Sequence, residues 1–318
     1  MKFQKLLAFF LGTILTSTSA QSQNFPNRPV RIIIPYAAGG GATILTRGLQ
    51  QGLSEALKVP VVMENKAGGA TLVGTSEVAR AAPDGYTLLM IPPLAWVGYY
   101  YSKTYETKVW EEMTPIAQFA ETPYNMIITR SGSGLDTWAK VVERAKAKPG
   151  TISGGGPAAG GLVGYTFNQL MEKSSVSGVY VPFQGSSPAF AALLGGHVDF
   201  QITTLGDGMT STRAGQTHAL AVSSDGRAAS ARDVPTFAEL GIGDTLMNTF
   251  SFWGPKGIDP KVVETLARAV QEAIKDPKYA EMAEKRDYKV GFKPGAQVHR
   301  EVKLFDEKWG PKLAADAK

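Results

Sequence analysis

Residues 29–47 read Pro29-Val-Arg-Ile-Ile-Ile-Pro-Tyr-Ala-Ala-Gly-Gly-Gly-Ala-Thr-Ile-Leu-Thr-Arg47. The β-branched run at residues 30–34 has the length and composition of a buried strand, and Pro35 ends it because proline cannot donate to a strand ladder. Three glycines follow at Gly39, Gly40 and Gly41, and their lack of a Cβ allows positive φ and close approach of a ligand. Apolar residues at helical spacing then predict a helix from residue 42 or 43 to about residue 57.

This strand, glycine turn and helix start would together form an anion site. The first amides of a helix have no intrahelical partner, and the helix dipole favours negative charge at that end. A tight turn that needs glycine for geometry alone is the alternative interpretation, and these residues by themselves leave both open. The organisation of the remaining chain favours the binding interpretation.

Composition limits the classes of protein to which the chain can belong. A length of 318 residues predicts two domains, and 43% hydrophobic with 19% charged residues is typical of a globular protein. The chain has no cysteine, which excludes disulfides, thiolate catalysis, cysteine metal sites and a lipid-modified cysteine. The net charge of +5 is modest and the basic residues are scattered, which argues against a nucleic-acid partner.

Residues 1–20 have the pattern of a secretory signal peptide. Lys2 and Lys5 form a basic start, residues 6–15 form an apolar run too short to span a bilayer, and Thr18-Ser-Ala20 supplies a small-residue cleavage site. We therefore expect a mature protein that starts near Gln21 and resides in the periplasm. No later run is apolar for long enough to predict a membrane span.

Strands and helices alternate along the chain, which predicts parallel sheets covered by helices. The order of elements in residues 29–130 is echoed in residues 151–257, and extended segments at residues 114–130 and 248–254 provide two crossings between the halves. We expect an α/β, two-lobed periplasmic binding protein, each lobe a mostly parallel sheet flanked by helices, with the ligand between the lobes. The first lobe would comprise residues 24–123 plus about 226–318, and the second lobe residues 124–225.

Enzyme motifs are weak in this chain. Gly154-x-Gly156-x-x-Ala159 matches the dinucleotide fingerprint, but the acidic residue that should follow at the end of the next strand is replaced by Gln184. The three histidines have no metal-ligand spacing, and no nucleophile and base can be paired. We expect no catalysis, no metal site and no cofactor, and a nucleotide-dependent enzyme remains the alternative.

Several long motifs resemble the Bug family, the periplasmic substrate-binding receptors of tripartite tricarboxylate transporters. They span almost the whole mature chain and read Phe25-Pro-Asn-Arg-Pro-Val-Arg-Ile-Ile-Ile-Pro-Tyr-Ala-Ala-Gly-Gly-Gly41, Val61-Val-Met-Glu-Asn-Lys-Ala-Gly-Gly69, Ala82-Pro-Asp-Gly-Tyr-Thr-Leu-Leu-Met90, Val181-Pro-Phe-Gln-Gly-Ser-Ser-Pro-Ala189, Leu194-Gly-Gly-His-Val-Asp199 and Val234-Pro-Thr-Phe-Ala-Glu-Leu-Gly241. The resemblance implies a Venus-flytrap fold, a small carboxylate ligand and delivery of that ligand to membrane permease subunits. A receptor that presents its closed form to a membrane sensor kinase is the alternative.

The resemblance also implies which residues bind the ligand, mainly through backbone amides of the turns after the strands. In the first lobe they are Tyr36, Ala38, Gly39, Gly40, Gly41, Ala42, Thr43, Pro92 and Trp96. In the second lobe they are Gly155, Gly156, Pro157, Ala158, Ala159, Gly160, Phe183, Gln184, Thr203, Thr204 and Asp207.

One departure from the family pattern bears on the ligand. The family turn often reads Gly-Gly-Gly-Thr-Asp, whereas Ala42 and Thr43 stand at the last two positions here, so an aspartate is absent. The loss of that carboxylate suits a ligand with anionic ends. We expect the two glycine runs to clamp a dicarboxylate, aromatic or of medium chain length, whose apolar middle is lined by Tyr36, Trp96 and Phe183. The protein is expected to be a monomer.

Overall fold

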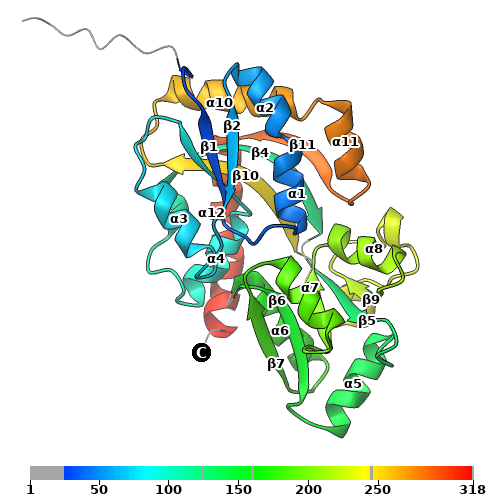
Figure 1. Ribbon diagram of the computed structural model, residues 1–318. Helices are drawn as coiled ribbons and strands as arrows, with labels where there is room; N and C mark the ends of the chain where they lie inside the picture. The colour runs from blue at the N-terminus through cyan, green and yellow to red at the C-terminus, as the bar shows by residue number, and fades with distance from the viewer. Residues whose placement is uncertain (1–24, 124, 159–160, 244–245, 317–318) are drawn as a thin grey trace, which may run out of the picture.

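The computed structural model describes residues 25–316 except residues 124, 159–160 and 244–245. The expected signal peptide lies outside the described residues. Two sheets form two lobes, one above the other in Figure 1. The first sheet has the strand order β11 (Lys289–Pro294), β4 (Met113–Pro123), β10 (Met247–Pro255), β3 (Thr87–Ile91), β1 (Val30–Ile34) and β2 (Val61–Asn65). The second has the order β7 (Gly178–Phe183), β6 (Ile152–Pro157), β8 (Phe200–Thr203), β5 (Met126–Arg130) and β9 (Thr217–Val222).

Both sheets are mixed rather than mostly parallel, which corrects that part of the expectation. In the first sheet β1 pairs in parallel with β2 and β3, whereas β10 pairs antiparallel with β3 and β4. In the second sheet β6 pairs in parallel with β7 and β8, and β5 pairs antiparallel with β8 and β9. The strands β4, β5, β9 and β10 flank the crossings between the lobes, so each sheet combines βα units with strands of the opposite direction.

Helices cover both sheets (Figure 1). Those of the first lobe are α1 (Gly41–Gly48), α2 (Gln50–Leu57), α3 (Leu72–Ala79), α4 (Leu94–Tyr101), α10 (Pro260–Ala273), α11 (Pro277–Glu284) and α12 (Gly295–Asp316). Those of the second lobe are α5 (Trp138–Ala147), α6 (Gly161–Lys173), α7 (Ser186–Leu194), α8 (Leu205–Arg213) and α9 (Phe237–Leu240). The single helix expected to end near residue 57 is divided at Leu49 into α1 and α2.

The chain passes between the lobes from β4 to β5 and again from β9 to β10. Residues 228–242 follow β9 and still contact the second lobe, since Thr236 bridges to Val222 and the Val222 N–H donates to the Pro235 carbonyl oxygen at 3.0 Å. We therefore propose that the second lobe extends beyond its expected end at residue 225, so that the second crossing lies closer to β10.

A further contact joins the lobes on one side. The C-terminal helix α12 descends from the first lobe towards the second in Figure 1, and its Trp309 ring meets the Tyr165 ring of α6 edge-on at 6.1 Å. Helix α4 packs against α6 so closely that a Cβ on Gly98 would lie 2.6 Å from the Gly161 Cα. The hydrophobic core is consequently continuous from α4 of the first lobe to α6 of the second.

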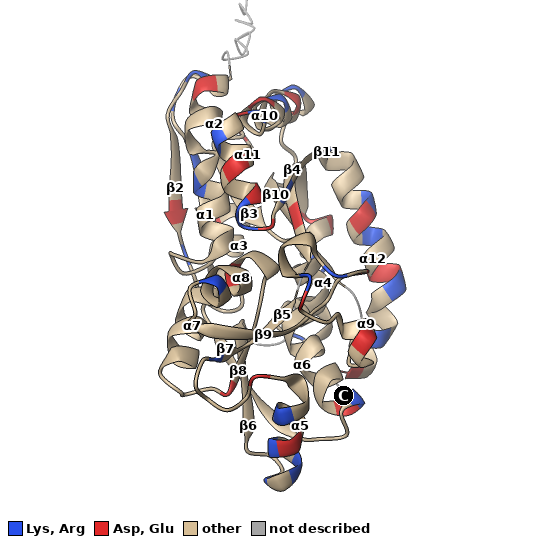
Figure 2. Cartoon of the chain, turned by 90° about the vertical axis from the view of Figure 1, so that its right-hand side faces the viewer, with Lys and Arg blue, Asp and Glu red and all other residues tan. Residues whose placement is uncertain are grey.

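Charged residues gather on outer elements such as α5 and α12, as Figure 2 shows. Within the described part of the chain, no helix is long and apolar enough to cross a bilayer.

Candidate functional site

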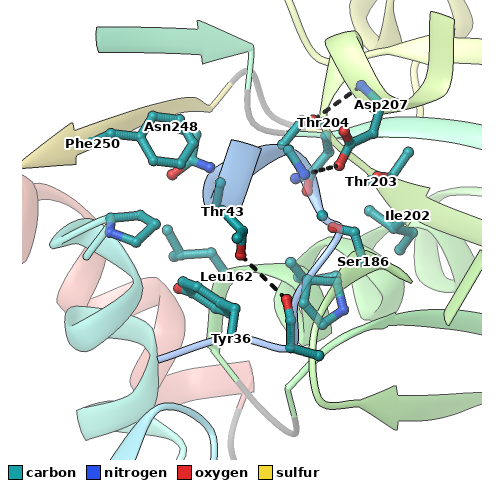
Figure 3. Close-up of a pocket in the computed structure, with 18 of the residues that line it drawn as sticks. Tyr36, Thr43, Leu162, Ser186, Ile202, Thr203, Thr204, Asp207, Asn248 and Phe250 are labelled. Carbon is teal, nitrogen blue, oxygen red and sulfur yellow. Dashed lines mark hydrogen bonds between the residues drawn. The ribbon is translucent and has the colours of Figure 1, made fainter. Parts of the chain in front are cut away.

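A cavity of about 60 Å³ lies where the two lobes meet. Residues of both lobes line it, and Figure 3 shows most of them as sticks. From the first lobe come Tyr36, Ala37, Gly40, Gly41, Ala42, Thr43, Pro92, Tyr99, Asn248 and Phe250. From the crossing and the second lobe come Asn125, Pro157, Leu162, Val163, Ser186, Ile202, Thr203, Thr204 and Asp207. An adjoining cavity of about 240 Å³ shares Gly40, Ser186, Thr203 and Asp207 with the first.

The first-lobe wall is the glycine turn after β1. Gly39 has φ of 91°, a conformation that strains any residue with a Cβ, and Gly40 is the N-cap of α1. The Thr43 hydroxyl donates to the Ala37 carbonyl oxygen at 3.3 Å, and the Asn65 side-chain amide donates to the Tyr36 carbonyl oxygen at 2.9 Å. Side-chain hydrogen bonds from α1 and from the neighbouring strand β2 therefore hold the turn in place.

The second lobe contacts this turn directly through Asp207. The Gly41 N–H, at the start of α1, donates to Asp207 Oδ2 at 3.2 Å, and the Ala37 N–H donates to the Gln184 carbonyl oxygen at 2.9 Å. Asp207 itself lies in the first turn of α8, where its N–H donates to the Thr204 hydroxyl at 3.4 Å. Desolvation raises the pKa of the Asp207 carboxyl, while the Gly41 amide and the charge of Arg286 act in the opposite direction.

Five helices begin at the cavity wall. Lining residues lie at or next to the first turns of α1, α4, α6, α7 and α8. Each start directs the positive end of a helix dipole towards the cavity, and the first amides of a helix are donors wherever no other acceptor takes them. Some of these amides are taken: the Gly41 N–H of α1 donates to Asp207, and the Ala95 and Trp96 N–H groups of α4 donate to the Pro92 and Pro93 carbonyl oxygens. No lysine, arginine or histidine is among the described residues that line this cavity. The site can therefore hold an anion through backbone amides, and Asp207 is the one acidic side chain among the described lining residues.

Three buried polar oxygens of the lining residues have no hydrogen-bond partner among the described residues: Asn125 Oδ1, Thr203 Oγ1 and Asn248 Oδ1. The orientation of the Asn125 amide is fixed by its neighbour. Asn125 Nδ2 donates to the Thr166 hydroxyl at 2.6 Å, and this hydroxyl donates to the Leu162 carbonyl oxygen at 2.9 Å. With the hydroxyl hydrogen directed at Leu162, the hydrogen-bond network assigns the nitrogen of Asn125 to the side of Thr166, and its oxygen remains as an acceptor.

Half of the residues expected to bind the ligand line the cavity. These are Tyr36, Gly40, Gly41, Ala42, Thr43, Pro92, Pro157, Thr203, Thr204 and Asp207. Gly39 lines the adjoining cavity instead. Ala38 and Gln184 are exposed, Phe183 and Ala158 are partly buried outside the lining, and Ala159 and Gly160 lie outside the described residues.

Trp96 is placed differently from the expectation. Its side chain is fully buried in the core, where its ring meets the Trp253 ring edge-on at 5.1 Å. Tyr99, one helical turn later on α4, lines the cavity in its place. The expected aromatic contribution from this segment is therefore supplied by a residue three positions further along the helix.

Gly155 and Gly156 are also placed differently, because the glycine run 154–156 lies inside strand β6 rather than in a turn. A Cβ on Gly154 would lie 2.5 Å from the Phe200 ring, and one on Gly156 would lie 2.8 Å from the Tyr180 hydroxyl. These glycines make room for aromatic side chains and do not open a helix. The clamp of two glycine turns is consequently not formed, and neither is the turn that a dinucleotide fingerprint requires.

The sequence interpretation missed several lining residues: Tyr99, Asn125, Leu162, Val163, Ile202, Asn248 and Phe250. Asn125 and Asn248 lie at or beside the two predicted crossings between the lobes. A polar residue within a segment that must run between two cores is a signal that would have identified both. Phe250 and Ile202 are apolar residues of buried strands. The sequence therefore does not distinguish them from residues that pack in the core.

Comparisons with known proteins agree with this architecture. The family model described as "Tripartite tricarboxylate transporter family receptor" (TctC) matches residues 45–313. Protein BugT of Bordetella pertussis is 31% identical over 281 residues, which cover 86% of this chain and 86% of BugT. The structure of the periplasmic binding protein BugD is similar with a TM-score of 0.83 at 28% identity, over 92% of this chain and 98% of BugD.

A structure described as a periplasmic transporter has a TM-score of 0.82 at 28% identity, over 89% of this chain and 95% of the other. The two-lobed α/β fold and the resemblance to the Bug family are thus confirmed. The chain belongs to the tripartite tricarboxylate transporter receptor family, a family of periplasmic solute-binding proteins.

Proposed function

We propose that this protein is a monomeric periplasmic receptor that captures a small carboxylate between its lobes and delivers it to the membrane permease subunits of a tripartite tricarboxylate transporter. Residues 1–20 would direct its export. The observation that carries the proposal is the convergence of five helix starts on a cavity whose described lining residues include no basic side chain.

Backbone amides suit a carboxylate that must later be released. Each helix start supplies about half a positive charge, and the starts whose first N–H groups are not already bonded also supply donors, so together they stabilise an anion without an ion pair. A buried arginine would bind the carboxylate more strongly and hold it longer. The rings of Tyr36 and Phe250 and the side chain of Leu162 line the same cavity and would contact the carbon chain of the ligand (Figure 3).

A thermal-shift screen tests the carboxylate class. A ligand that binds only the folded protein stabilises it by about 2.7 kcal/mol at a concentration 100 times its Kd, which raises the melting temperature. We expect organic acids to raise this temperature and uncharged sugars and simple amines to leave it unchanged. A clear shift from sugars or amines, with none from any organic acid, would contradict the proposal.

Closure of the lobes tests the receptor mechanism. Contacts from both lobes exist together only when the cleft is closed, so a ligand that bridges them must shift the population towards the closed form. We expect small-angle scattering to show a smaller radius of gyration when a stabilising acid from the screen is present at saturation. An unchanged radius at saturation would argue against ligand-driven closure.

A further inference from the structure

Asp207 occupies the position in which a second carboxylate of the ligand was expected. We infer that the cleft takes a monocarboxylate whose other end carries a hydrogen-bond donor, an ammonium or hydroxyl group, and that Asp207 accepts a hydrogen bond from this donor. The inference rests on the proposed function and specifies its ligand class. It replaces the expectation of a dicarboxylate.

The first step concerns the amide at the start of α1. The Gly41 N–H, which a ligand carboxylate would require at this turn, already donates to Asp207 Oδ2 at 3.2 Å. Asp207 also lies in the first turn of α8, so one carboxylate interacts with the positive dipole ends of both α1 and α8. The first turns of α4, α6 and α7 contain no acidic residue. At the start of α4 the Ala95 and Trp96 N–H groups already donate to the Pro92 and Pro93 carbonyl oxygens at 3.0 and 3.1 Å. The starts of α6 and α7 therefore remain for the carboxylate of the ligand, and α1 is not among them.

The second step concerns charge. Desolvation already disfavours the charged form of Asp207, and a ligand carboxylate beside it would add a second acidic group to a cleft whose described lining residues include no cation. Arg286, which acts electrostatically on Asp207, lines the adjoining cavity and not this one. Like charges repel more strongly in a site shielded from water than in solution, so a second anionic end is disfavoured next to Asp207. An ammonium or hydroxyl group at that end removes the repulsion and supplies a donor.

The third step is independent of Asp207. Asn125 Oδ1 is an acceptor without a partner among the described residues, and its orientation is fixed by Thr166. Asn248 Oδ1 lines the same cavity and also has no partner in the described part of the chain. The Thr203 hydroxyl likewise lacks a partner there, but it can donate as well as accept. Buried acceptors that lack donors are costly unless a bound molecule supplies the donors. The wall of the cavity therefore favours a ligand with N–H or O–H groups.

Matched series of ligands test the inference on the full-length mature protein. Calorimetric titration at pH 7 would compare 4-aminobutyrate, 4-hydroxybutyrate and succinate, then the corresponding five-carbon and six-carbon sets, the last being 6-aminohexanoate, 6-hydroxyhexanoate and adipate. Within a set only the distal group changes. We expect the amino or hydroxy acid to bind at least tenfold more tightly than the diacid in the set of best-fitting length.

Two variants examine the role of Asp207 itself. Asp207→Asn keeps an oxygen that can accept from Gly41 but removes the charge, and should reduce the preference for the donor-bearing acid at least tenfold. Asp207→Ser frees the Gly41 amide and should strengthen binding of the diacid at least tenfold. The control is Asp136→Asn, the same change next to α5 at the far end of the second lobe in Figure 1, which should leave all affinities within twofold.

The possible results separate the inference from the proposed function. A wild-type protein that binds the diacid as tightly as its amino and hydroxy counterparts, or more tightly, would overturn the inference and leave a carboxylate receptor standing. An unchanged ligand preference in a correctly folded Asp207→Asn variant would also overturn it. A folded wild-type protein that binds no carboxylate of any kind would overturn the proposed function, and the inference with it.

Discussion

Two runs of three glycines, one in each lobe, have different physical roles in this protein. Gly39–Gly41 lie in the turn between β1 and α1, at the wall of the cleft, where Gly39 has positive φ. Gly154–Gly156 lie within β6, where they give space to the rings of Phe200, Phe167 and Tyr180. In the first run, the absence of side chains lets the backbone of the turn approach the second lobe. In the second run, it lets aromatic side chains of the same lobe pack against the backbone of β6. Substitutions in the two runs should therefore damage different properties.

The change Gly154→Val should have the largest effect, and it should act on stability. A Cβ at this position would lie 2.5 Å from the Phe200 ring and 2.8 Å from the Phe167 ring, so the core must move to accommodate it. We expect the free energy of unfolding to fall by about 3 kcal/mol, the upper part of the range for overpacked cores. Chemical denaturation measures this change. Gly226→Val is the control, because Gly226 has no neighbour within 4 Å of the added Cβ.

The change Gly40→Val should act mainly on binding. Gly40 has φ of −77°, which valine can adopt, and its Cβ would be 3.7 Å from Ser186 Cβ across the interface between the lobes. The two γ-carbons of valine would then hold the lobes apart. We expect the affinity for the best acid to fall about 100-fold, equivalent to about 2.7 kcal/mol.

Stability should fall by no more than about 1 kcal/mol, the cost of a poorer N-cap. Calorimetric titration and a melting curve of the same preparation separate the two effects. Should Gly40→Val lower stability as much as Gly154→Val while binding normally, the assigned difference between the two glycine runs would be wrong.

The change Tyr180→Phe tests how the second lobe holds the loop after its glycine run. The Tyr180 hydroxyl lies 3.0 Å from the Ala158 carbonyl oxygen and 3.2 Å from that of Pro157, which lines the cavity. Its loss should cost about 1 kcal/mol of stability and weaken binding a few-fold. Tyr86→Phe is a matched control, since the Tyr86 hydroxyl donates to Asn27 Oδ1 and Tyr86 does not line the cavity. Equal losses of affinity in both variants would show that Pro157 does not depend on Tyr180 for its position.

The change Arg47→Ala should have the smallest effect. Arg47 is exposed on α1, and its guanidinium donates to Asn65 Oδ1 at 2.9 Å and to the Met63 carbonyl oxygen at 3.2 Å. We expect stability to change by no more than about 0.5 kcal/mol and affinity to remain within twofold. Abolished binding in Arg47→Ala, alongside retained binding in Gly40→Val, would refute recognition through backbone amides.

The first-lobe site was more predictable from the sequence than the second because its signals are local. A β-branched strand ended by Pro35, followed by glycines and a helical pattern, specifies strand, turn and helix start within a few residues. The second run has the same residues, but whether they form a turn or a strand depends on Phe200 and Phe167, which are distant in sequence. Periodicity in one segment contains no information about such neighbours.

Contacts between residues distant in the sequence also explain the other differences between the sequence predictions and the structure. On α4 the sequence could not distinguish Trp96 from Tyr99 as the residue that faces the cleft, because that choice depends on where Trp253 of β10 packs. The family resemblance implied Asp207 as a site residue, and Asp207 lines the cavity, but its bond to Gly41 joins residues 166 positions apart. Only the folded structure, with both lobes in place, shows that this carboxylate accepts a hydrogen bond from the start of α1.

The burial of Trp96 has an optical consequence. All five tryptophans of the chain are buried, with Trp309 the most exposed at 7%, and none lines either of the two cavities described above. Their emission should therefore change strongly when the protein unfolds, and no tryptophan should respond to direct contact with a ligand. Trp309, which meets Tyr165 of the other lobe, is placed to respond only to movement of the lobes. A direct reporter of occupancy has to be introduced at the rim of the cleft, for example on the exposed Ala38.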